Sequence, residues 1–286
     1  MMTSADFKRI RKTQSISVFA ILLIISLFVN LSCQKSGVTE EGPSTPTTIV
    51  IRFENKVDSL PLVLDTMIYK NSSNDLYKVT DLQYFISDIT LHRDDGVDYT
   101  VFNDDGIHYV DARIPSSSYL LVNASVPYGK FDSVSLTFGI DEEENISNRF
   151  LNPPERDMYW PDILGGGYHY MKMNLLWKKQ GFDRTYPFNF HLGIGQIYKG
   201  NVINPDSIIS YVQNFFYVNL PASGFSIEKG LTKSMVITMN VNQWFTGDND
   251  FDFQKYPNMM MQNQAALHNA CLNGRKAISV RFTSGK

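Results

Sequence analysis

The feature that most restricts the fold of this sequence is a series of short segments rich in β-branched and aromatic residues. Asn, Asp, Ser and Gly separate them, as in the tight turns Asp94-Asp95-Gly96 and Asp104-Asp105-Gly106. Apolar and polar residues alternate in residues 131–139, which is the period of a half-buried strand. Strands are predicted over residues 49–55, 82–91, 107–111, 131–139, 168–177, 188–193, 211–219, 235–241 and 277–282. This spacing predicts a mainly β chain folded as an antiparallel β-sandwich of the immunoglobulin-like or jelly-roll type.

Only one or two short helices are expected. Residues 141–150 can form one, and residues 258–272 contain better helix formers, with Asn273-Gly274 as the expected end. Because the sequence shows no internal repeat and no clear boundary, residues 49–286 are predicted to form a single domain.

The N-terminus has the pattern of an export signal. Four cationic residues precede an apolar run of about 12 residues, which is short for a membrane span, and Leu31-Ser32-Cys33 follows at once. This pattern predicts a lipoprotein signal peptide over residues 1–32 and lipidation of Cys33; a plain cleaved signal and an N-terminal membrane anchor are the alternatives. The polar residues 33–48 are expected to form a flexible tether. We therefore expect an outer membrane lipoprotein in the cell envelope, held to the membrane by its lipid anchor and either periplasmic or surface-exposed.

The net charge and the absence of two catalytic motifs argue against several classes of function. The net charge is −3 and no basic stripe occurs after the signal, so we expect no nucleic-acid partner. Gly-x-Ser-x-Gly and His-Glu-x-x-His motifs are absent, and we expect a protein that is not an enzyme. Paired carboxylates for glycoside hydrolysis stay open, since the sequence does not show geometry.

The chain has five histidines, and a metal site needs two or three of them to converge. His169 and Met171 alternate on a predicted strand, so both are expected to face one side, and His191 lies on a nearby predicted strand. A His/Met/His cluster suits Cu(I). In the alternative interpretation all three residues only pack. Gly165-Gly166-Gly167, just before this strand, is predicted to be a flexible hinge.

Four pieces of sequence stand out in this order: Phe138-Gly139-Ile140-Asp141 followed by Asn145, Met158-Tyr159-Trp160-Pro161, residues 167–172 and Phe190-His191-Leu192-Gly193. Together they resemble the family of MbnP-like copper-binding proteins. Residues 82–89 and 106–111 are also similar to family segments. The sequence departs from the family pattern at Asp162, in place of a second tryptophan, at Ile146, in place of a histidine, and in having no cysteine near His191.

The resemblance implies a copper-binding β-sandwich whose ligands include histidines and a tryptophan oxidised to kynurenine. It also implies a partner, a dihaem enzyme of the cytochrome c peroxidase type, that carries out this oxidation. Trp160 matches the family tryptophan and His191 the family histidine. The candidate metal residues are thus His191, His169, Trp160 and Met171, with copper as the expected ion.

A second hypothesis needs no metal. Tyr159, Trp160, Tyr168 and Tyr170 can form a surface platform for a glycan or a protein partner in the cell envelope. Exposure of these rings as one patch favours this hypothesis, and their burial counts against it.

Overall fold

A computed structural model describes residues 47–101, 105–124, 126–200, 202–228, 232–247, 249–256 and 260–284. These residues belong to one compact unit, Ser44–Lys286. The predicted signal peptide, Cys33 and the tether up to residue 46 lie outside the described residues. Within the described part of the chain, no helix is long and apolar enough to cross a membrane.

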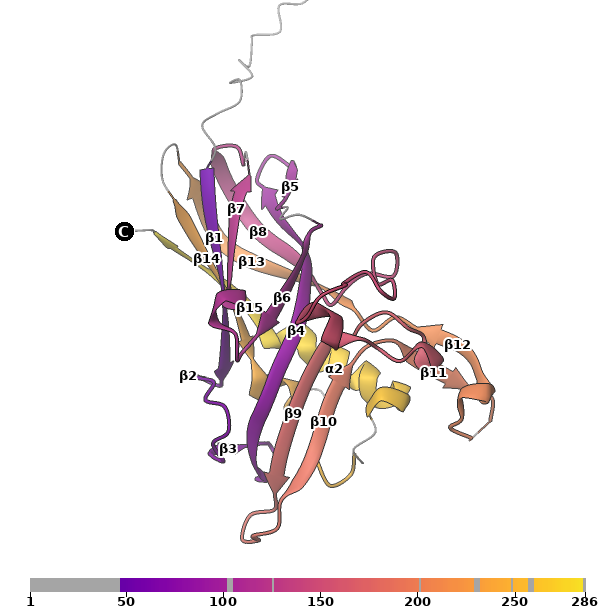
Figure 1. Cartoon of the computed structure of the whole chain (residues 1–286). Coiled ribbons are helices and arrows are strands. Elements are labelled where there is room, and N and C mark those ends of the chain that lie inside the picture. Colours follow the sequence, from indigo (N-terminus) through magenta and orange to yellow (C-terminus); the bar gives the residue numbers. More distant parts are fainter. Residues whose placement is uncertain are drawn as a thin grey trace, which may run out of the picture. The chain divides into compact units, whose positions relative to one another are not determined.

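The first sheet contains both ends of the described chain (Figure 1). Its order is β15-β14-β1-β2, and β7 also pairs with β1. The strands are β1 (Thr47–Val57), β2 (Leu60–Pro61), β7 (Tyr119–Ala124), β14 (Lys233–Asn240) and β15 (Ile278–Ser284). β1 begins at Thr47, one residue before the predicted end of the tether at residue 48.

The second sheet is built around β4 (Leu76–Arg93), the longest strand. Its order is β10-β9-β4-β8-β13, and β3, β5 and β6 pair with β4 beside this path. The other strands are β3 (Tyr69–Lys70), β5 (Asp98–Thr100), β6 (Ile107–Asp111), β8 (Gly129–Phe138), β9 (Met171–Lys178), β10 (Tyr186–Leu192) and β13 (Phe216–Ile227). A separate two-stranded sheet joins β11 (Gly195–Tyr198) to β12 (Ile208–Val212).

The mainly β sandwich predicted from the sequence is confirmed. One pair differs from the antiparallel expectation, because β1 lies parallel to β14, with Phe53 opposite Ile237. Parallel neighbours cannot be joined by a tight turn, and here residues 58–232 separate the two strands. Strand periodicity cannot reveal such a pairing.

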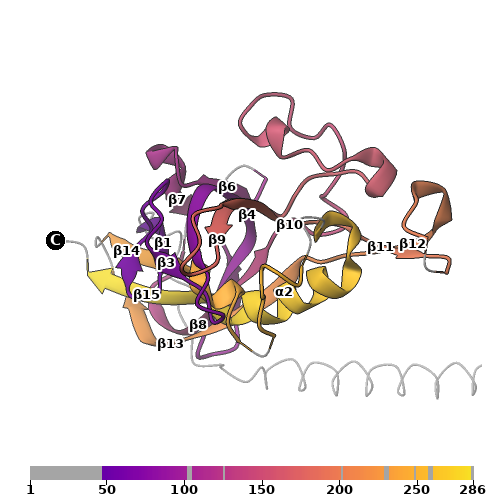
Figure 2. The ribbon, with the colours of Figure 1, turned by 90° about the horizontal axis from the view of Figure 1, so that it is seen from below.

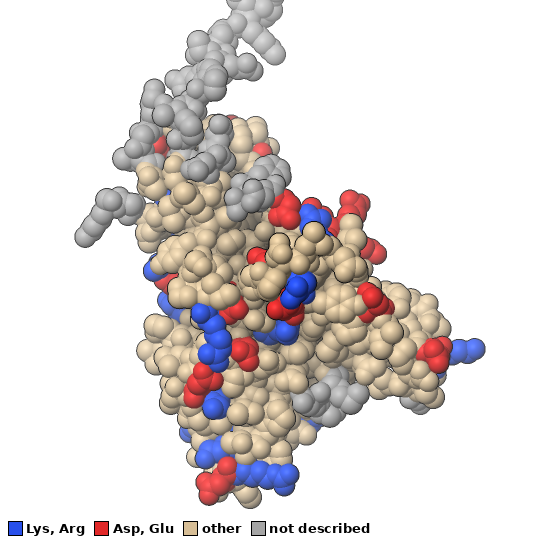
Figure 3. Space-filling view, viewed as in Figure 1, with Lys and Arg blue, Asp and Glu red and all other residues tan. Residues whose placement is uncertain are grey.

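The alternation of side chains divides the second sheet into two faces. In β9, Met171, Met173, Leu175 and Trp177 are buried, while the residues between them are only partly buried. The buried row belongs to the apolar core, and we call this the inner face of the sheet. Lys172 and Asn174 lie on the other side, which we call the outer face. On the side of the molecule seen in Figure 3, basic and acidic residues are interspersed rather than gathered in a stripe.

A large aromatic cluster packs against the second sheet, around Trp244. Trp244 is fully buried, and its ring centroid lies 5.1 Å from that of Phe138, 5.9 Å from Phe190 and 6.0 Å from Phe216. Trp244 belongs to one of the six short 3-10 helices among the described residues: η1 (Pro115–Ser118), η2 (Glu155–Met158), η3 (Asp162–Leu164), η4 (Pro205–Ser207), η5 (Val241–Trp244) and η6 (Met260–Gln262).

The α-helix α2 (Gln264–Ala277) packs on this cluster and contacts η5, β11, β13 and β15 (Figure 2). The Asn263 side chain caps its start by accepting from the backbone N–H of Ala266 at 3.0 Å. The predicted end at Asn273-Gly274 is wrong, because the helix continues to Ala277. Asn273 instead donates to the carbonyls of Trp244 and Asn249, at 3.1 and 2.7 Å. Residues 141–150, the other predicted helix, form turns.

Gly274 is required by packing rather than by helix termination. A Cβ atom at this position would overlap the Trp244 ring and lie 2.8 Å from Cζ of Phe216. We predict that Gly274→Ala lowers the free energy of unfolding by about 1–3 kcal/mol, although alanine is the better helix former. Urea unfolding measures the change. Asn269→Ala, a half-buried position on the same helix, is the control and should be near neutral, and a stabilised Gly274→Ala protein would contradict the packing argument.

Candidate functional site

Residues 155–170 fold against the outer face of the second sheet, where β9 begins and β10 ends. Lys172 Nζ donates to the carbonyl of Asp157 at 3.2 Å, and the backbone N–H of Tyr170 donates to the carbonyl of Leu192 at 2.8 Å. Met158 and Trp160 are buried in this segment, with exposed fractions of 1% and 0%. The segment therefore removes part of an otherwise polar sheet face from water.

The glycine turn at residues 165–167 sets the path of this segment. All three residues have positive φ, and a Cβ on Gly167 would lie 2.6 Å from Oδ1 of Asn145. That oxygen accepts from the backbone N–H of Tyr168 at 2.8 Å, and Ser147 Oγ accepts from the N–H of Gly167 at 2.8 Å. The turn is thus tightly packed and hydrogen-bonded, unlike the flexible hinge expected from the sequence.

Three of the four candidate metal residues come together here. The ring centroids of Trp160 and His169 lie 4.7 Å apart, and those of His169 and His191 lie 5.0 Å apart. Both contacts are edge-to-face, with interplanar angles of 73° and 83°. His169 therefore lies between the indole and the second imidazole, and we call His169 and His191 the histidine pair.

The hydrogen bonds of His169 define its tautomer. Its Nδ1 lies 2.9 Å from the carbonyl oxygen of Met158, which accepts but cannot donate, so Nδ1 carries the proton. The same carbonyl accepts from the backbone N–H of His169 at 2.6 Å. Nε2 then carries the lone pair; it is buried and has no hydrogen-bond partner among the described residues.

A relay of two side chains orients His191. Nε2 of His191 lies 2.8 Å from Oδ1 of Asn174, whose Nδ2 donates to Oδ2 of Asp81 at 3.3 Å. Because the amide nitrogen is turned toward Asp81, its oxygen faces the imidazole, and Nε2 of His191 is the donor. The lone pair of His191 is therefore on Nδ1. Each imidazole of the pair has one nitrogen held by an oxygen and one able to bind a metal ion, as in metal-ligating histidines.

Met171 does not join this group, so the expectation that it shares a side with both histidines is wrong. Met171 is opposite Leu192 and fully buried on the inner face, whereas His191 is opposite Lys172 on the outer face. β9 begins only at Met171, so the alternation of a strand does not extend back to His169. The irregular backbone before β9 allows His169 to reach the outer face.

Burial and one nearby cation keep the histidine pair neutral. Burial, with smaller effects from His191 and Lys172, lowers the pKa of His169 to about 3. Burial and then the Lys172 ammonium lower the pKa of His191 to about 4. Burial alone would raise the pKa of Asp81, but hydrogen bonds from Asn174 and Arg113 bring it below its ordinary value. The relay thus ends on a carboxylate that is ionised at neutral pH.

The donor set limits the metals that this site can hold. Among the described residues, no three His, Cys, Asp or Glu side chains are grouped so that they could hold a metal ion. The other three histidines lie elsewhere: His92 contacts Asp98 and Ser135, His108 stacks on Phe53, and His268 is exposed on α2. The site therefore offers two neutral imidazoles.

The aromatic platform of the second hypothesis is not present at the predicted positions. Trp160, Tyr168 and Tyr170 are buried, and only Tyr159 is exposed, at 39%. Tyr168 and Tyr170 instead use their hydroxyl groups inside the protein, on the N–H of Phe150 and on Gln213. Their burial counts against a glycan or protein surface built on these rings.

Sequence reasoning missed Asn174, Asp81, Lys172 and the carbonyl of Met158. Lys172 and Asn174 alternate on one strand, which signals a shared face. The register of β9 against β10 was needed to place His191 beside them, and the loop between these strands does not reveal it.

Comparison with known proteins gives two matches. The family model of MbnP matches residues 46–262. The solved structure of MbnP from Methylosinus trichosporium is similar in fold, with a TM-score of 0.51 at 14% identity over 84% of this chain and 100% of the other. No curated protein matches the chain.

The depressed pKa values make the metal-free fold sensitive to acid. Unfolded histidine titrates near pH 6.5, so the contribution of each neutral imidazole is fully present above about pH 6.5. As the pH falls toward the folded pKa values of about 4 and about 3, the unfolded chain binds more protons. The free energy of unfolding then falls by about 1.4 kcal/mol per pH unit for each group.

We predict that His191→Gln removes about one such proton from the acid dependence of stability. Urea unfolding of metal-free protein at several values between about pH 7 and pH 4 measures the slope. His268→Gln, at an exposed position on α2, should keep the native slope. An unchanged slope for His191→Gln would mean that His191 is not held neutral by the fold.

Proposed function

The chain belongs to the MbnP family, and from this membership we propose that it is a copper-binding protein of the cell envelope whose histidine pair holds the ion. The observation that carries the proposal is the unpartnered lone pair on buried Nε2 of His169, 5.0 Å from His191 between ring centroids. A buried acceptor without a donor is costly, and a metal ion would compensate that cost.

The dimensions of the histidine pair fit a shared ion. Metal–imidazole bonds are about 2 Å long, so two imidazoles on one ion have centroids up to about 6 Å apart. The observed separation is within this limit. Two neutral nitrogens suit Cu(I), which accepts imidazole ligands at low coordination number. Copper is the cargo in this proposal, and the protein supplies the two oriented nitrogens and the exclusion of water.

Trp160 needs a chemical change before it can be a ligand. Its indole nitrogen is a donor only and is already engaged with the carbonyl of Leu164 at 3.2 Å. Oxidation to kynurenine, as the family resemblance implies, would replace the indole with an aryl amine and a ketone, which both have lone pairs. We propose that a dihaem partner of the cytochrome c peroxidase type performs this oxidation. In the unmodified chain, Trp160 is a wall of the site.

The envelope location rests on the N-terminal sequence. We propose that the signal over residues 1–32 directs export, and that lipid on Cys33 anchors the domain to the outer membrane through the tether.

Intact-mass analysis of protein purified from its native envelope tests the proposed lipidation of Cys33 and the proposed oxidation of Trp160. We expect loss of residues 1–32, the added mass of a lipid on Cys33, and the mass change of kynurenine localised by peptide sequencing to Trp160. A chain that starts at Met1 would contradict the anchor. Unmodified Trp160 in copper-loaded protein would exclude it as a ligand and leave the histidine pair.

Copper titration of purified variants tests the site. We predict that His169→Gln and His191→Gln each weaken Cu(I) affinity by at least about 100-fold, since each removes a ligand, and that Asn174→Ala weakens it by about 10–100-fold through loss of ring orientation. A chromophoric Cu(I) chelator measures affinity by competition. His268→Gln is the matched control, because it removes an exposed histidine on α2.

A variant that is expected to increase copper affinity complements the histidine variants. The Lys172 ammonium lies close enough to lower the pKa of both histidines, so it also repels a bound cation. Lys172→Gln should tighten copper binding several-fold, by about 1 kcal/mol, and less so at high salt. If the histidine variants bind copper as tightly as the native protein, the proposed site is wrong.

A further inference from the structure

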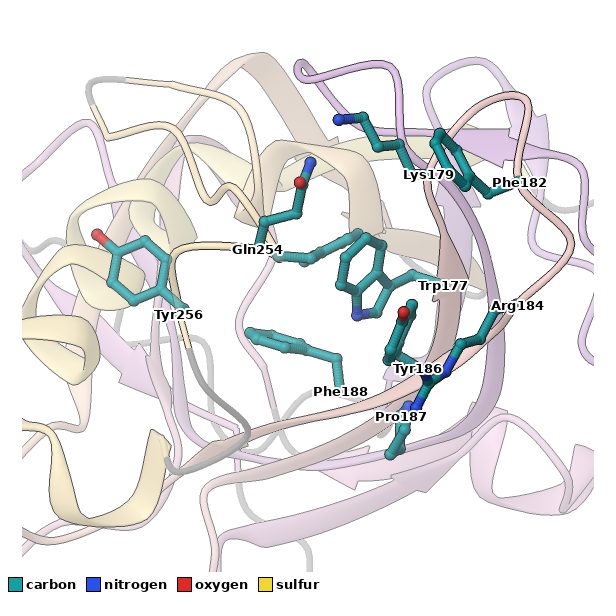
Figure 4. A pocket seen from close by; sticks show the side chains of 10 residues that line it. Trp177, Lys179, Phe182, Arg184, Tyr186, Pro187, Phe188, Gln254 and Tyr256 are labelled. Atoms are coloured by element: carbon teal, nitrogen blue, oxygen red, sulfur yellow. The ribbon is translucent and has the colours of Figure 1, made fainter.

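A cavity lies on the same β9–β10 hairpin as His191, but at the other end of the hairpin. The cavity has a volume of about 550 Å³ and lies between the β9–β10 connection and residues 253–256 (Figure 4). Tyr186 is opposite Trp177 here, whereas His191 is opposite Lys172 near the start of β9. The volume is in the range that holds a small organic ligand.

Aromatic rings make up most of the cavity wall. Phe188 and Phe253, both nearly fully buried, lie 5.0 Å apart between ring centroids, and Trp177 lies 5.9 Å from Phe253 and 5.3 Å from Tyr186. Tyr256 stands across the open space from Trp177 in Figure 4. Because the deep rings are packed in the core, this wall is preformed, and it favours a flat apolar ligand.

The charges at the cavity are of one sign. Lys179 and Arg184 are among its ten lining residues, and no Asp or Glu is. The Arg184 guanidinium carbon lies 4.9 Å from the Tyr186 ring centroid, and the Lys179 ammonium lies 5.8 Å from that of Phe182. A stacked guanidinium keeps its N–H groups available for a carboxylate.

The nearby carboxylates do not neutralise these cations. Asp183 lies 3.9 Å from Lys178, and Asp252 lies 3.8 Å from Lys255. Asp75 is buried and accepts from the Gln254 side chain at 3.5 Å, although its charge also acts on Lys179. Neither Lys179 nor Arg184 has a salt-bridge partner within 4.0 Å in the described part of the chain.

We propose that this cavity binds a small planar aromatic carboxylate. Its ring system stacks among Trp177, Phe188 and Tyr256, and its carboxylate accepts from the Arg184 guanidinium, with the Lys179 ammonium adding attraction. The Trp177 indole N–H, which has no hydrogen-bond partner among the described residues and points toward the open space in Figure 4, is a further donor to the ligand. This site is separate from the copper proposal.

Titration of metal-free protein with 2-naphthoate tests the proposal. Trp160 and Trp244 are fully buried elsewhere, so a saturable change in tryptophan fluorescence reports on Trp177. We expect 2-naphthamide, which has the same ring and no charge, to bind about tenfold more weakly or worse, since it loses charge-assisted hydrogen bonds. Absence of saturable naphthoate binding, or equal affinity for the amide, would overturn the proposal.

The Arg184→Gln variant tests whether Arg184 provides the preference for naphthoate over naphthamide. Arg184 is exposed, so the substitution should leave the fold intact, and naphthoate affinity should fall to that of the amide. Arg275→Gln is the matched control, because this exposed arginine on α2 also stacks on a ring, that of Phe216 at 5.6 Å. Equal naphthoate affinities in the two variants, or preferential binding of a neutral oligosaccharide, would also overturn the assignment. All outcomes are independent of copper.

Discussion

The pairing of β4 is the constraint on which the rest of the structure depends. Its 18 residues are hydrogen-bonded in turn to β3, β9, β6, β8 and β5. Since an unpaired backbone group in the interior is costly, this arrangement fixes the register of the neighbouring strands and thereby their two faces. The inner face receives Met171 and the core, and the outer face receives Lys172 and His191. The candidate copper site therefore depends on pairing between strands that are far apart in the sequence.

Burial of the histidine pair explains both why the two imidazoles are neutral and why stability is expected to depend on pH. Residues 155–170 cover part of the outer face, and desolvation lowers both imidazole pKa values. The neutral rings then have lone pairs at neutral pH, and the carbonyl of Met158 and the amide of Asn174 decide which nitrogen carries each. The same desolvation that preforms this pair of donors is therefore expected to lower stability at low pH. The aromatic cavity at the far end of β10 is built differently, from core rings and unpaired surface cations.

Local patterns predicted elements well where one strand pairs regularly. β6 has the bounds expected for residues 107–111, and β15 lies within two residues of its expected bounds. Residues 211–219 were expected as one strand, but β12 ends at Val212 and β13 begins at Phe216. Asn214 between them is buried, where its side chain donates to the carbonyl of Gly193 at 2.9 Å and accepts from Gln264 at 3.0 Å. These partners are distant in sequence, so no local pattern indicates the break.

The sequence alone determined the β-rich class, the family and which three rings are candidates for the site, because alternation, turn residues and ordered motifs are local properties of the chain. Tertiary structure decided the parallel β1–β14 pair, the exclusion of Met171 from the site, and the meeting of Trp160, His169 and His191. The physical reason is that a side chain's face and neighbours depend on register and on which segment covers the sheet. Both are set by contacts between residues far apart in the chain.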